Sequence, residues 1–218
     1  MKKLIAMFVF LLLPVSAGAS LITTEHIVNG DFETGDLTGW TNVNTGSGGW
    51  AINNGTFDPT GPGLPLSPID GAFDVVSFQS GGGFHNLYQI VNLPSLFSSA
   101  TLSWSDRIRN AAGTYSDPNQ EWRVLVEDLN GGLIGEVFST NPDDVLLQTG
   151  PNNRSFDLTA LLQPLGGQSV RISFEQQDNL FYFNATLDNV SFTTSVVSAP
   201  ATVVMLGLVI ALVRLRRR

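Results

Sequence analysis

Apolar and polar residues alternate one by one in several short segments of this 218-residue chain. In segment 168–175 every second residue is a large apolar one, and segments 101–105 and 121–128 repeat the pattern. Successive side chains of a β-strand point to opposite faces of the sheet, so a period of two predicts strands with one buried face. We therefore expect strands rather than long helices to build the fold.

Glycine- and asparagine-rich turns separate these segments. Asn130-Gly131-Gly132 follows the strand expected at 121–128 and is typical of a hairpin turn. One short helix is expected at 158–162, with Asp157 as its cap. Many short strands with glycine-rich turns predict an all-β, jelly-roll β-sandwich. Further strands are expected at 26–29, 49–53, 73–78, 85–91, 133–138, 155–158 and 182–192.

The N-terminus instead carries an apolar run next to basic residues. Lys2 and Lys3 precede the run 4–13, and Ala17 and Ala19 form the small-x-small pattern of a signal-peptidase site. About ten apolar residues are too few to cross ~30 Å of hydrocarbon, so an uncleaved membrane helix is the weaker alternative. Residues 1–19 are therefore expected to be a cleaved secretory signal peptide.

The C-terminus has a second apolar run, at 199–213, with a basic cluster directly after it. Fifteen uncharged residues form about 22 Å of helix, which is short for a permanent membrane span. Arginines favour the cytoplasmic side of a membrane helix. We expect an exported protein whose tail is held in the membrane by a short transmembrane helix. The basic residues of the cluster are Arg214, Arg216, Arg217 and Arg218.

Segment 197–218 resembles the PEP-CTERM sorting signal of Gram-negative exopolysaccharide producers, which joins a short motif, an apolar helix and an arginine cluster. The usual motif is Val-Pro-Glu-Pro, whereas this chain has Val197, Ser198, Ala199 and Pro200, so only the outer positions match. The resemblance implies processing by an exosortase-type enzyme. It also implies a cell-surface or extracellular-matrix location after transient anchoring in the inner membrane. An ordinary C-terminal anchor that stays in place is the alternative.

Charge is divided between the ends and the middle of the chain. Six of the eleven basic residues lie in the terminal segments, whereas all nineteen acidic residues lie between them. A middle part with five arginines and no lysine is unsuited to nucleic acid, because nucleic-acid binding depends on neutralising phosphates. Cysteine is absent, so the expected domain, residues 20–196, depends on one core without disulfides.

Two runs in this domain, VNGDFETGDLTGW at 28–40 and TLDNVSF at 186–192, resemble the start and end of galactose-binding-like jelly-roll domains. That group includes several carbohydrate-binding module families, and segment 156–174 resembles the penultimate region of the same fold. In such modules a structural Ca²⁺ often joins the first and last strands. The resemblance implies Glu33 and Asp188 as its carboxylate ligands, and Ca²⁺ favours such oxygen ligands. The alternative is that both carboxylates bond only to backbone amides of a loop.

A sugar-binding site needs an aromatic platform beside hydrogen-bonding groups, and several aromatic residues near polar segments are expected to be exposed. Tyr88 and Tyr182 belong to this group, although core packing is the alternative for each aromatic residue. The charged cluster of Asp106, Arg107 and Arg109 at a strand end is a second candidate, with a solvated strand end as its alternative. The candidate ligand contacts are Trp50, Tyr115, Trp122, Asp106 and Arg107.

Catalysis has little support in the sequence. The chain has no cysteine, and His26 and His85 belong to no metal or triad spacing. Adjacent carboxylates in a strand point to opposite faces and do not make a glycosidase pair. We expect an exported, non-catalytic surface or matrix protein with polysaccharide as its candidate partner. The alternatives are a structural surface protein held by its C-terminal helix without a small ligand, and a polysaccharide-active enzyme.

Overall fold

The structure is a computed structural model, and it describes residues 19–59, 65–79 and 81–198. The signal-peptide run, Ala17 and most of the expected sorting segment lie outside the described residues. The chain divides into a large compact unit, Thr23–Val196, and a second unit formed by the two terminal segments. Within the described ranges, no helix is long and apolar enough to cross a membrane. Outside them lie Ala199, Pro200, Arg214, Arg216, Arg217 and Arg218.

The described residues form eleven strands and two short helical turns. In chain order these are β1 (Leu21–Glu25), β2 (Thr41–Gly46), β3 (Gly49–Asn53), β4 (Asp74–Phe78), β5 (Gly83–Asn92), β6 (Ser99–Asn110), β7 (Gln120–Glu127), β8 (Leu133–Ser139), β9 (Asn152–Asp157), α1 (Thr159–Leu162), a 3₁₀ turn (Gln163–Leu165), β10 (Ser169–Asp178) and β11 (Phe183–Val197).

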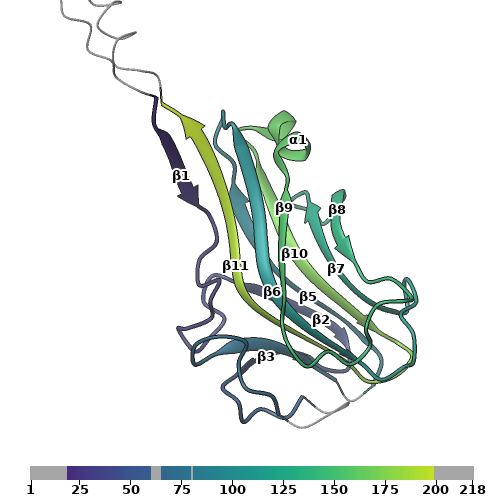
Figure 1. Ribbon diagram of the computed structural model, residues 1–218. Coiled ribbons are helices and arrows are strands. Elements are labelled where there is room, and N and C mark those ends of the chain that lie inside the picture. The colour runs from purple at the N-terminus through teal and green to yellow at the C-terminus, as the bar shows by residue number, and fades with distance from the viewer. Residues whose placement is uncertain (1–18, 60–64, 80, 199–218) are drawn as a thin grey trace, which may run out of the picture. The chain divides into compact units, whose positions relative to one another are not determined.

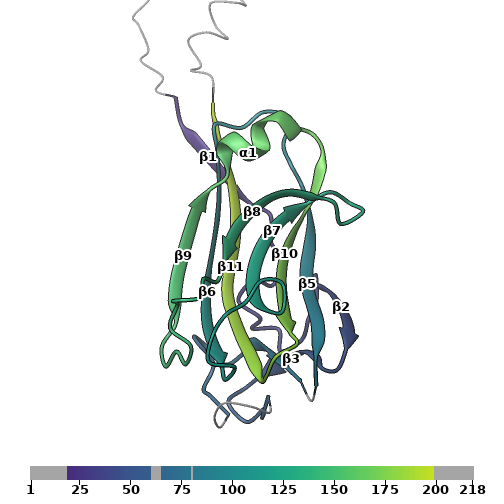
Figure 2. The same ribbon diagram turned by 90° about the vertical axis from the view of Figure 1, so that its right-hand side faces the viewer.

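The strands form two sheets that face each other (Figures 1 and 2). One sheet has the order β3-β4-β11-β6-β9, with β1 also paired to β11, and the other has the order β2-β5-β10-β7-β8. Successive strands from β4 to β7, and again from β8 to β11, alternate between the two sheets. This alternation is typical of a jelly roll. The prediction of a β-sandwich is confirmed.

The core lies between the two sheets and is rich in aromatic rings. Val170, Ile172 and Phe174 of β10 are at most 1% exposed, as the alternating pattern predicted. The ring of Phe174 lies 5.7 Å from that of Trp104 on the opposite sheet and 6.1 Å from that of Trp122. Such aromatic pairs add to the stabilisation that comes from apolar burial.

Most of the expected strands are present, but two predictions at the N-terminal side were wrong. The first strand is Leu21–Glu25, ahead of the expected 26–29, and β2 was not expected at all. Every residue of β2 is exposed, and Val43 is the only large apolar residue of its sequence TNVNTG. It therefore lacks the apolar alternation from which strands are predicted. The strand forms by pairing with β5 at the edge of its sheet.

The expected hairpin turn and the short helix are confirmed. Gly131 has a φ of +87° and links β7 to β8, which pair in an antiparallel register. Helix α1 begins one residue later than expected, after Leu158. The carboxylate of Asp157 nevertheless accepts the backbone N–H of Thr159 at 2.8 Å, so it satisfies one free amide of the first turn.

The opening run at 28–40 packs directly on a bulge in β11. The register of β11 shifts between Asp188 and Ser191, and Asn189 has a φ of +52°. The N–H of Val190 donates to the carbonyl oxygen of Gly30 at 2.8 Å. A Cβ atom at position 30 would lie 1.9 Å from the Val190 oxygen, so this contact requires glycine.

Strand β11 has fifteen residues and runs the length of the large unit. Its first residue, Phe183, follows the loop that leaves β10. Near its other end, the Oγ of Ser195 lies 2.9 Å from the Oγ1 of Thr23 in β1. The large unit therefore begins and ends side by side, far along β11 from the β10–β11 loop.

Candidate ligand-binding site

A pocket of about 240 Å³ opens at the end of the sandwich where β10 turns into β11. Two loops form it, the one between β4 and β5 and the one between β10 and β11. Its described lining consists of Gln79, Gly81, Gly82, Asp178, Asn179, Leu180, Phe181 and Tyr182. We call it the Asp178 pocket.

Three consecutive apolar side chains beside this pocket are open to solvent. Leu180 is 51% exposed, Phe181 56% and Tyr182 36%. The two aromatic rings meet edge to face, with their centroids 5.0 Å apart. Exposed neighbouring rings at a pocket are available to the apolar face of a ligand.

The fully buried side chain of Gln120 in β7 fixes this loop. Its Nε2 donates to the carbonyl oxygen of Phe181 at 2.7 Å, and its Oε1 accepts the N–H of Leu180 at 3.1 Å. The N–H of Asn179 also donates to the carbonyl oxygen of Asn119 at 2.7 Å. The backbone below the two rings is therefore held in place before any ligand binds.

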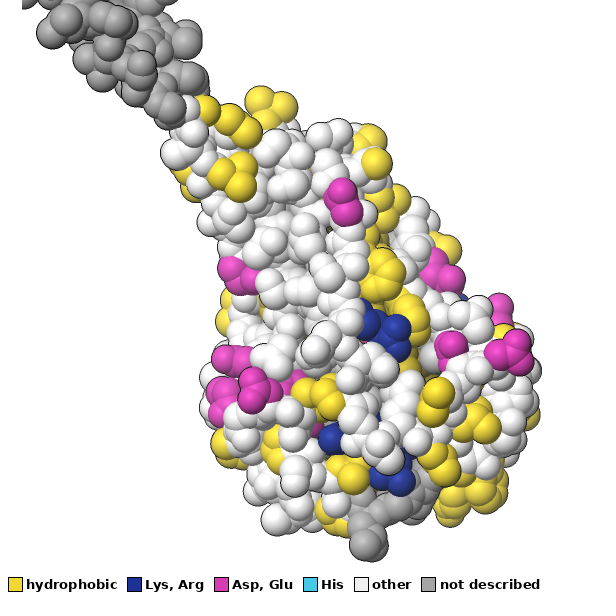
Figure 3. Space-filling view, viewed as in Figure 1, with side chains coloured by type: hydrophobic (Ala, Val, Ile, Leu, Met, Phe, Trp, Pro, Cys, Tyr) yellow, Lys and Arg dark blue, Asp and Glu magenta, His cyan; other side chains and the backbone are white. Residues whose placement is uncertain are grey.

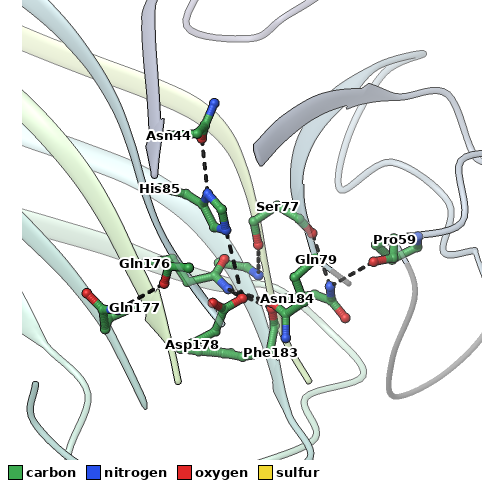
Figure 4. A network of polar contacts seen from close by, with 12 residues as sticks. Asn44, Pro59, Ser77, Gln79, His85, Gln176, Gln177, Asp178, Phe183 and Asn184 are labelled. Carbon is green, nitrogen blue, oxygen red and sulfur yellow. Dashed lines mark hydrogen bonds and ion pairs between the residues drawn. The ribbon is translucent and has the colours of Figure 1, made fainter. Parts of the chain in front are cut away.

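A network of buried polar side chains lies at the base of the pocket (Figure 4). The Nε2 of Gln176 donates to the carbonyl oxygen of Phe183 at 2.6 Å, to Oε1 of Gln79 at 3.1 Å and to Oδ2 of Asp178 at 3.3 Å. Buried polar groups are unfavourable unless they are hydrogen-bonded, so these bonds stabilise the network. They also orient the side chain of Gln79, which lines the pocket.

The tautomer of His85 follows from a chain of hydrogen bonds that leads away from the pocket. Nδ2 of Asn42 donates to the carbonyl oxygen of Trp50, and Nδ2 of Asn44 donates to Oδ1 of Asn42 at 2.8 Å. Oδ1 of Asn44 then faces Nδ1 of His85 at 3.1 Å and can only accept. Nδ1 therefore carries the proton of the neutral ring in this arrangement, and a hydrogen bond with the backbone of Ser47 partly offsets the effect of burial on the pKa of His85.

His85 and Asp178 face each other at the base without forming a close ion pair. Nε2 of His85 lies 3.9 Å from Oδ2 of Asp178, and both side chains are fully buried. Burial raises the pKa of Asp178 to about 7 and lowers the pKa of His85. Near neutral pH the histidine is therefore uncharged, and the carboxyl group is poised between its two forms.

The expectation that Trp50, Tyr115 and Trp122 are exposed was wrong. Their exposed fractions are 4%, 2% and 0%. The rings of Trp50 and Trp122 pack on each other with centroids 5.7 Å apart, and the hydroxyl of Tyr115 donates to the carbonyl oxygen of Val145 at 3.1 Å. With no exposed ring face, none of the three forms an accessible platform in this structure.

Asp106 is also buried, and it holds another side chain in place. Its Oδ2 accepts Nε1 of Trp104 at 2.8 Å and Nε of Arg154 at 2.5 Å. Its Oδ1 accepts Nδ2 of Asn152 at 2.9 Å and Nη2 of Arg154 at 3.1 Å. The guanidinium of Arg154 also lies 3.8 Å above the ring of Phe138. Asp106 therefore positions Arg154 and is not itself open to a ligand.

Arg154 lines a second, larger hollow of about 440 Å³, together with Asn152, Gln148 and Asp144. In Figure 3, basic side chains lie among hydrophobic ones in a hollow of the face seen in Figure 1. Arg107, the other charged candidate, lies elsewhere: it donates to the carbonyl oxygen of Ser67 at 2.9 Å and is 6% exposed. It fastens the 65–73 segment to the outer side of β6.

Glu33 and Asp188 both accept hydrogen bonds from backbone amides of one loop, which is the arrangement expected as the alternative to calcium binding. Oε1 of Glu33 accepts the N–H groups of Ala72 and Phe73 at 2.8 and 3.0 Å, and Oδ2 of Asp188 accepts the N–H of Asp70 at 3.0 Å. Among the described residues, no three His, Cys, Asp or Glu side chains gather as metal ligands do. These oxygens face amide donors, so the geometry does not fit a ready-made cage. A calcium ion there stays a prediction.

Tyr182, noted in the sequence as an aromatic residue near a polar loop, does line the pocket. The sequence reasoning missed Phe181, Gln120 and the pair of His85 with Asp178. One signal was available for the loop: Leu180, Phe181 and Tyr182 are consecutive, and successive residues between two strands cannot all point into the core. The polar residues come from β5, β7 and β10, and only strand pairing brings them together.

No protein-family model matches the sequence, and no curated protein does either. Solved structures resemble the fold. The K3 adhesin domain of Lys-gingipain from Porphyromonas gingivalis W83 aligns with a TM-score of 0.52 and 16% identity, over 78% of this chain and 98% of that domain. The enzymatically active domain of tailspike protein 4 from bacteriophage CBA120 aligns with a TM-score of 0.51 and 13% identity. The alignment covers 80% of this chain but only 21% of the tailspike chain.

A family 61 carbohydrate-binding module, solved with β-1,4-galactotriose, also aligns, with a TM-score of 0.47 and 13% identity over 78% of this chain and 97% of that one. This TM-score is too low to carry an argument. The other two likenesses establish the β-sandwich fold that the sequence predicted. Because they include an adhesin domain and an enzymatic one, the fold does not decide between binding and catalysis.

Proposed function

We propose that this protein is an exported, non-catalytic β-sandwich that binds a glycan at the Asp178 pocket. One observation carries the proposal: the exposed rings of Phe181 and Tyr182, fixed by Gln120, stand beside amide and carboxyl groups of the same pocket. A sugar ring presents an apolar C–H face and a polar rim of hydroxyls. Ring faces and hydrogen-bonding groups side by side complement both.

The charge of the pocket supports this ligand class over nucleic acid. Its described lining contains the carboxyl group of Asp178 and neither lysine nor arginine. Phosphate binding depends on such cations, so a polynucleotide backbone would find no counter-charge here. An uncharged or cationic glycan meets no such obstacle.

A binding role is also favoured by the number of carboxyl groups. Glycosidases place two of them on either side of the bond that is cleaved. The described lining of the Asp178 pocket offers one, and His85 is fully buried behind it. The alternative is a polysaccharide-active enzyme. Release of reducing ends from a glycan would establish that activity.

The cellular address belongs to the proposal as well. The apolar run with two lysines at the N-terminus and the arginine-ended run at the C-terminus support export and transient anchoring in the inner membrane. We propose processing by an exosortase-type enzyme and delivery to the surface or extracellular matrix of a Gram-negative bacterium. Mass spectrometry of the secreted protein would identify its C-terminal residue, and a tail recovered intact would contradict the processing step.

Retention on immobilised polysaccharides tests the binding function. The full chain is compared with the double variant Phe181→Ala/Tyr182→Ala, and with Leu96→Ala as a control that removes an 82%-exposed apolar side chain outside the pocket. We expect the double variant to lose retention and the control to keep it. If the unaltered protein is retained on no glycan, including the polysaccharide of its own producer, the proposal fails.

The exposed apolar loop also favours one alternative, a structural surface protein that works through protein contacts. Leu180 contributes a third apolar side chain that a sugar does not require. Sedimentation of the protein with and without the Phe181→Ala/Tyr182→Ala change separates the two functions. Self-association that is lost in the variant, without glycan retention in the unaltered protein, would favour the structural role.

A further inference from the structure

The base of the Asp178 pocket holds three hydrogen-bond acceptors without partners among the described residues. They are Nε2 of His85, Oδ1 of Asp178 and Oε1 of Gln176. The three residues are 0%, 2% and 0% exposed. Buried polar atoms are paired in the great majority of cases, so three unpaired ones in one place call for a physical explanation.

Each of the three atoms accepts and does not donate. Nδ1 of His85 faces Oδ1 of Asn44 and donates to it in this arrangement, which leaves Nε2 as the acceptor of the neutral ring. The amide of Gln176 is oriented by Nε2, which donates to the carbonyl oxygen of Phe183, so its other atom is the oxygen. The carboxyl group of Asp178 only accepts when it is ionised.

The three side chains converge on one point at the base of the pocket (Figure 4). Oδ2 of Asp178 lies 3.9 Å from Nε2 of His85 and 3.3 Å from Nε2 of Gln176. Of the three residues, Asp178 is the one that lines the pocket, and its side chain is fully buried there. The entrance is flanked by the rings of Phe181 and Tyr182.

We propose, on the basis of the glycan-binding function above, that the pocket selects a primary ammonium group, such as that of a 2-amino sugar. An ammonium group carries three N–H donors and no acceptor, which matches a base composed of acceptors. Its positive charge complements the Asp178 carboxylate in a lining without lysine or arginine. The faces of the Phe181 and Tyr182 rings attract a cation further.

The same geometry disfavours the common alternatives on a sugar ring. A hydroxyl group supplies one donor hydrogen and leaves its own lone pairs facing other acceptors. A carboxylate brings a second negative charge to Asp178, and the carbonyl of an N-acetyl group brings another acceptor. Selectivity therefore arises from repulsion of the wrong group as well as attraction of the right one.

Titration of the full chain at pH 7 and constant ionic strength tests the proposal, with glucosamine, glucose and N-acetylglucosamine as matched ligands. We expect glucosamine to bind at least tenfold more tightly than either of the other two. Methylammonium chloride should compete with glucosamine, whereas the same concentration of sodium chloride should not. This competition needs no variant and so does not depend on how a variant folds.

Two variants localise the effect. Asp178→Asn should lose at least tenfold in glucosamine affinity, whereas Asp143→Asn, which removes one charge from an exposed residue outside the pocket, should lose none. Equal binding of glucose and glucosamine would overturn the ammonium selectivity and leave glycan binding intact. An equal loss in both variants would reduce the effect to net charge and also overturn it. Binding of no sugar and no polysaccharide would remove both proposals.

Discussion

The carboxylate of Asp106 offers the strongest single test of which contacts stabilise this fold. It is fully buried and accepts hydrogen bonds from Trp104, Asn152 and Arg154. Asp106→Asn keeps the shape of the side chain but removes its charge and turns one acceptor into a donor. The guanidinium of Arg154 then loses its counter-charge, and at least one of these donors faces another donor.

The magnitude follows from the burial of the two partners. Removing one partner of a buried ion pair costs about 3–5 kcal/mol in the free energy of unfolding. The Arg154 side chain is 19% exposed, so water offsets part of the loss, and we expect about 3 kcal/mol. In a domain of this size that corresponds to a fall of roughly 6–12 °C in Tm.

Urea denaturation of four proteins measures the effect: the unaltered chain, Asp106→Asn, Arg154→Met and the double variant. Because the second change removes the charge that the first leaves unpaired, the double variant should lose at least about 1 kcal/mol less than the sum of the single changes. Asp143→Asn, at an exposed position, is the control for surface charge. A cost for Asp106→Asn within about 0.5 kcal/mol of that control, or strictly additive single effects, would refute the reasoning.

Three further predictions concern pH, calcium and backbone packing. The pKa of Asp178 rises from 3.8 to about 7 on folding, so its proton stabilises the folded protein at low pH and is lost as pH rises towards neutrality. Between pH 5 and pH 8, the free energy of unfolding measured by urea denaturation should therefore fall less in Asp178→Asn than in the unaltered chain. A parallel decline in both proteins would contradict this. If Glu33 and Asp188 hold Ca²⁺, roughly 1 mM of the ion should raise Tm and Glu33→Gln should abolish the rise; calorimetry without any shift would exclude the ion. Gly30→Ala places a Cβ 1.9 Å from a carbonyl oxygen and should cost about 1–3 kcal/mol; Gly150→Ala, with no atom within 4 Å of the added Cβ, should change little.

The sequence predicted most of the sandwich because its strands are half-buried and alternate cleanly. β10 shows this in its first half, where Val170 and Ile172 are buried and Ser169 and Arg171 are only half-buried; beyond it, polar residues of both faces are buried too. The same alternation also predicts that Trp122 is buried, because it shares its phase with Val124 and Val126 and so faces the core with them. Expecting it at the surface gave more weight to nearby polar residues than to the periodicity. β2 has no apolar phase, so only its partner strand defines it.

The pocket was less accessible to sequence reasoning for a different reason. Gln120, His85 and Asp178 lie in three strands and are separated by dozens of residues in the chain. Each is a buried polar residue in a strand face that also carries large apolar residues, which marks a position of interest but not its neighbours. Their proximity depends on the register that pairs β10 with both β5 and β7. No local spacing encodes that register.

The length of β11 determines how far the Asp178 pocket lies from the two ends of the large unit. Its fifteen residues connect the β10–β11 loop to the place where the large unit's two ends meet. At about 3.3 Å per residue, the strand separates these places by roughly 40 Å of backbone. A ligand bound at the pocket would thus lie at the opposite end of β11 from the two ends of the large unit. A tensile load between that ligand and those ends would run lengthwise through this single strand and its hydrogen-bonded neighbours.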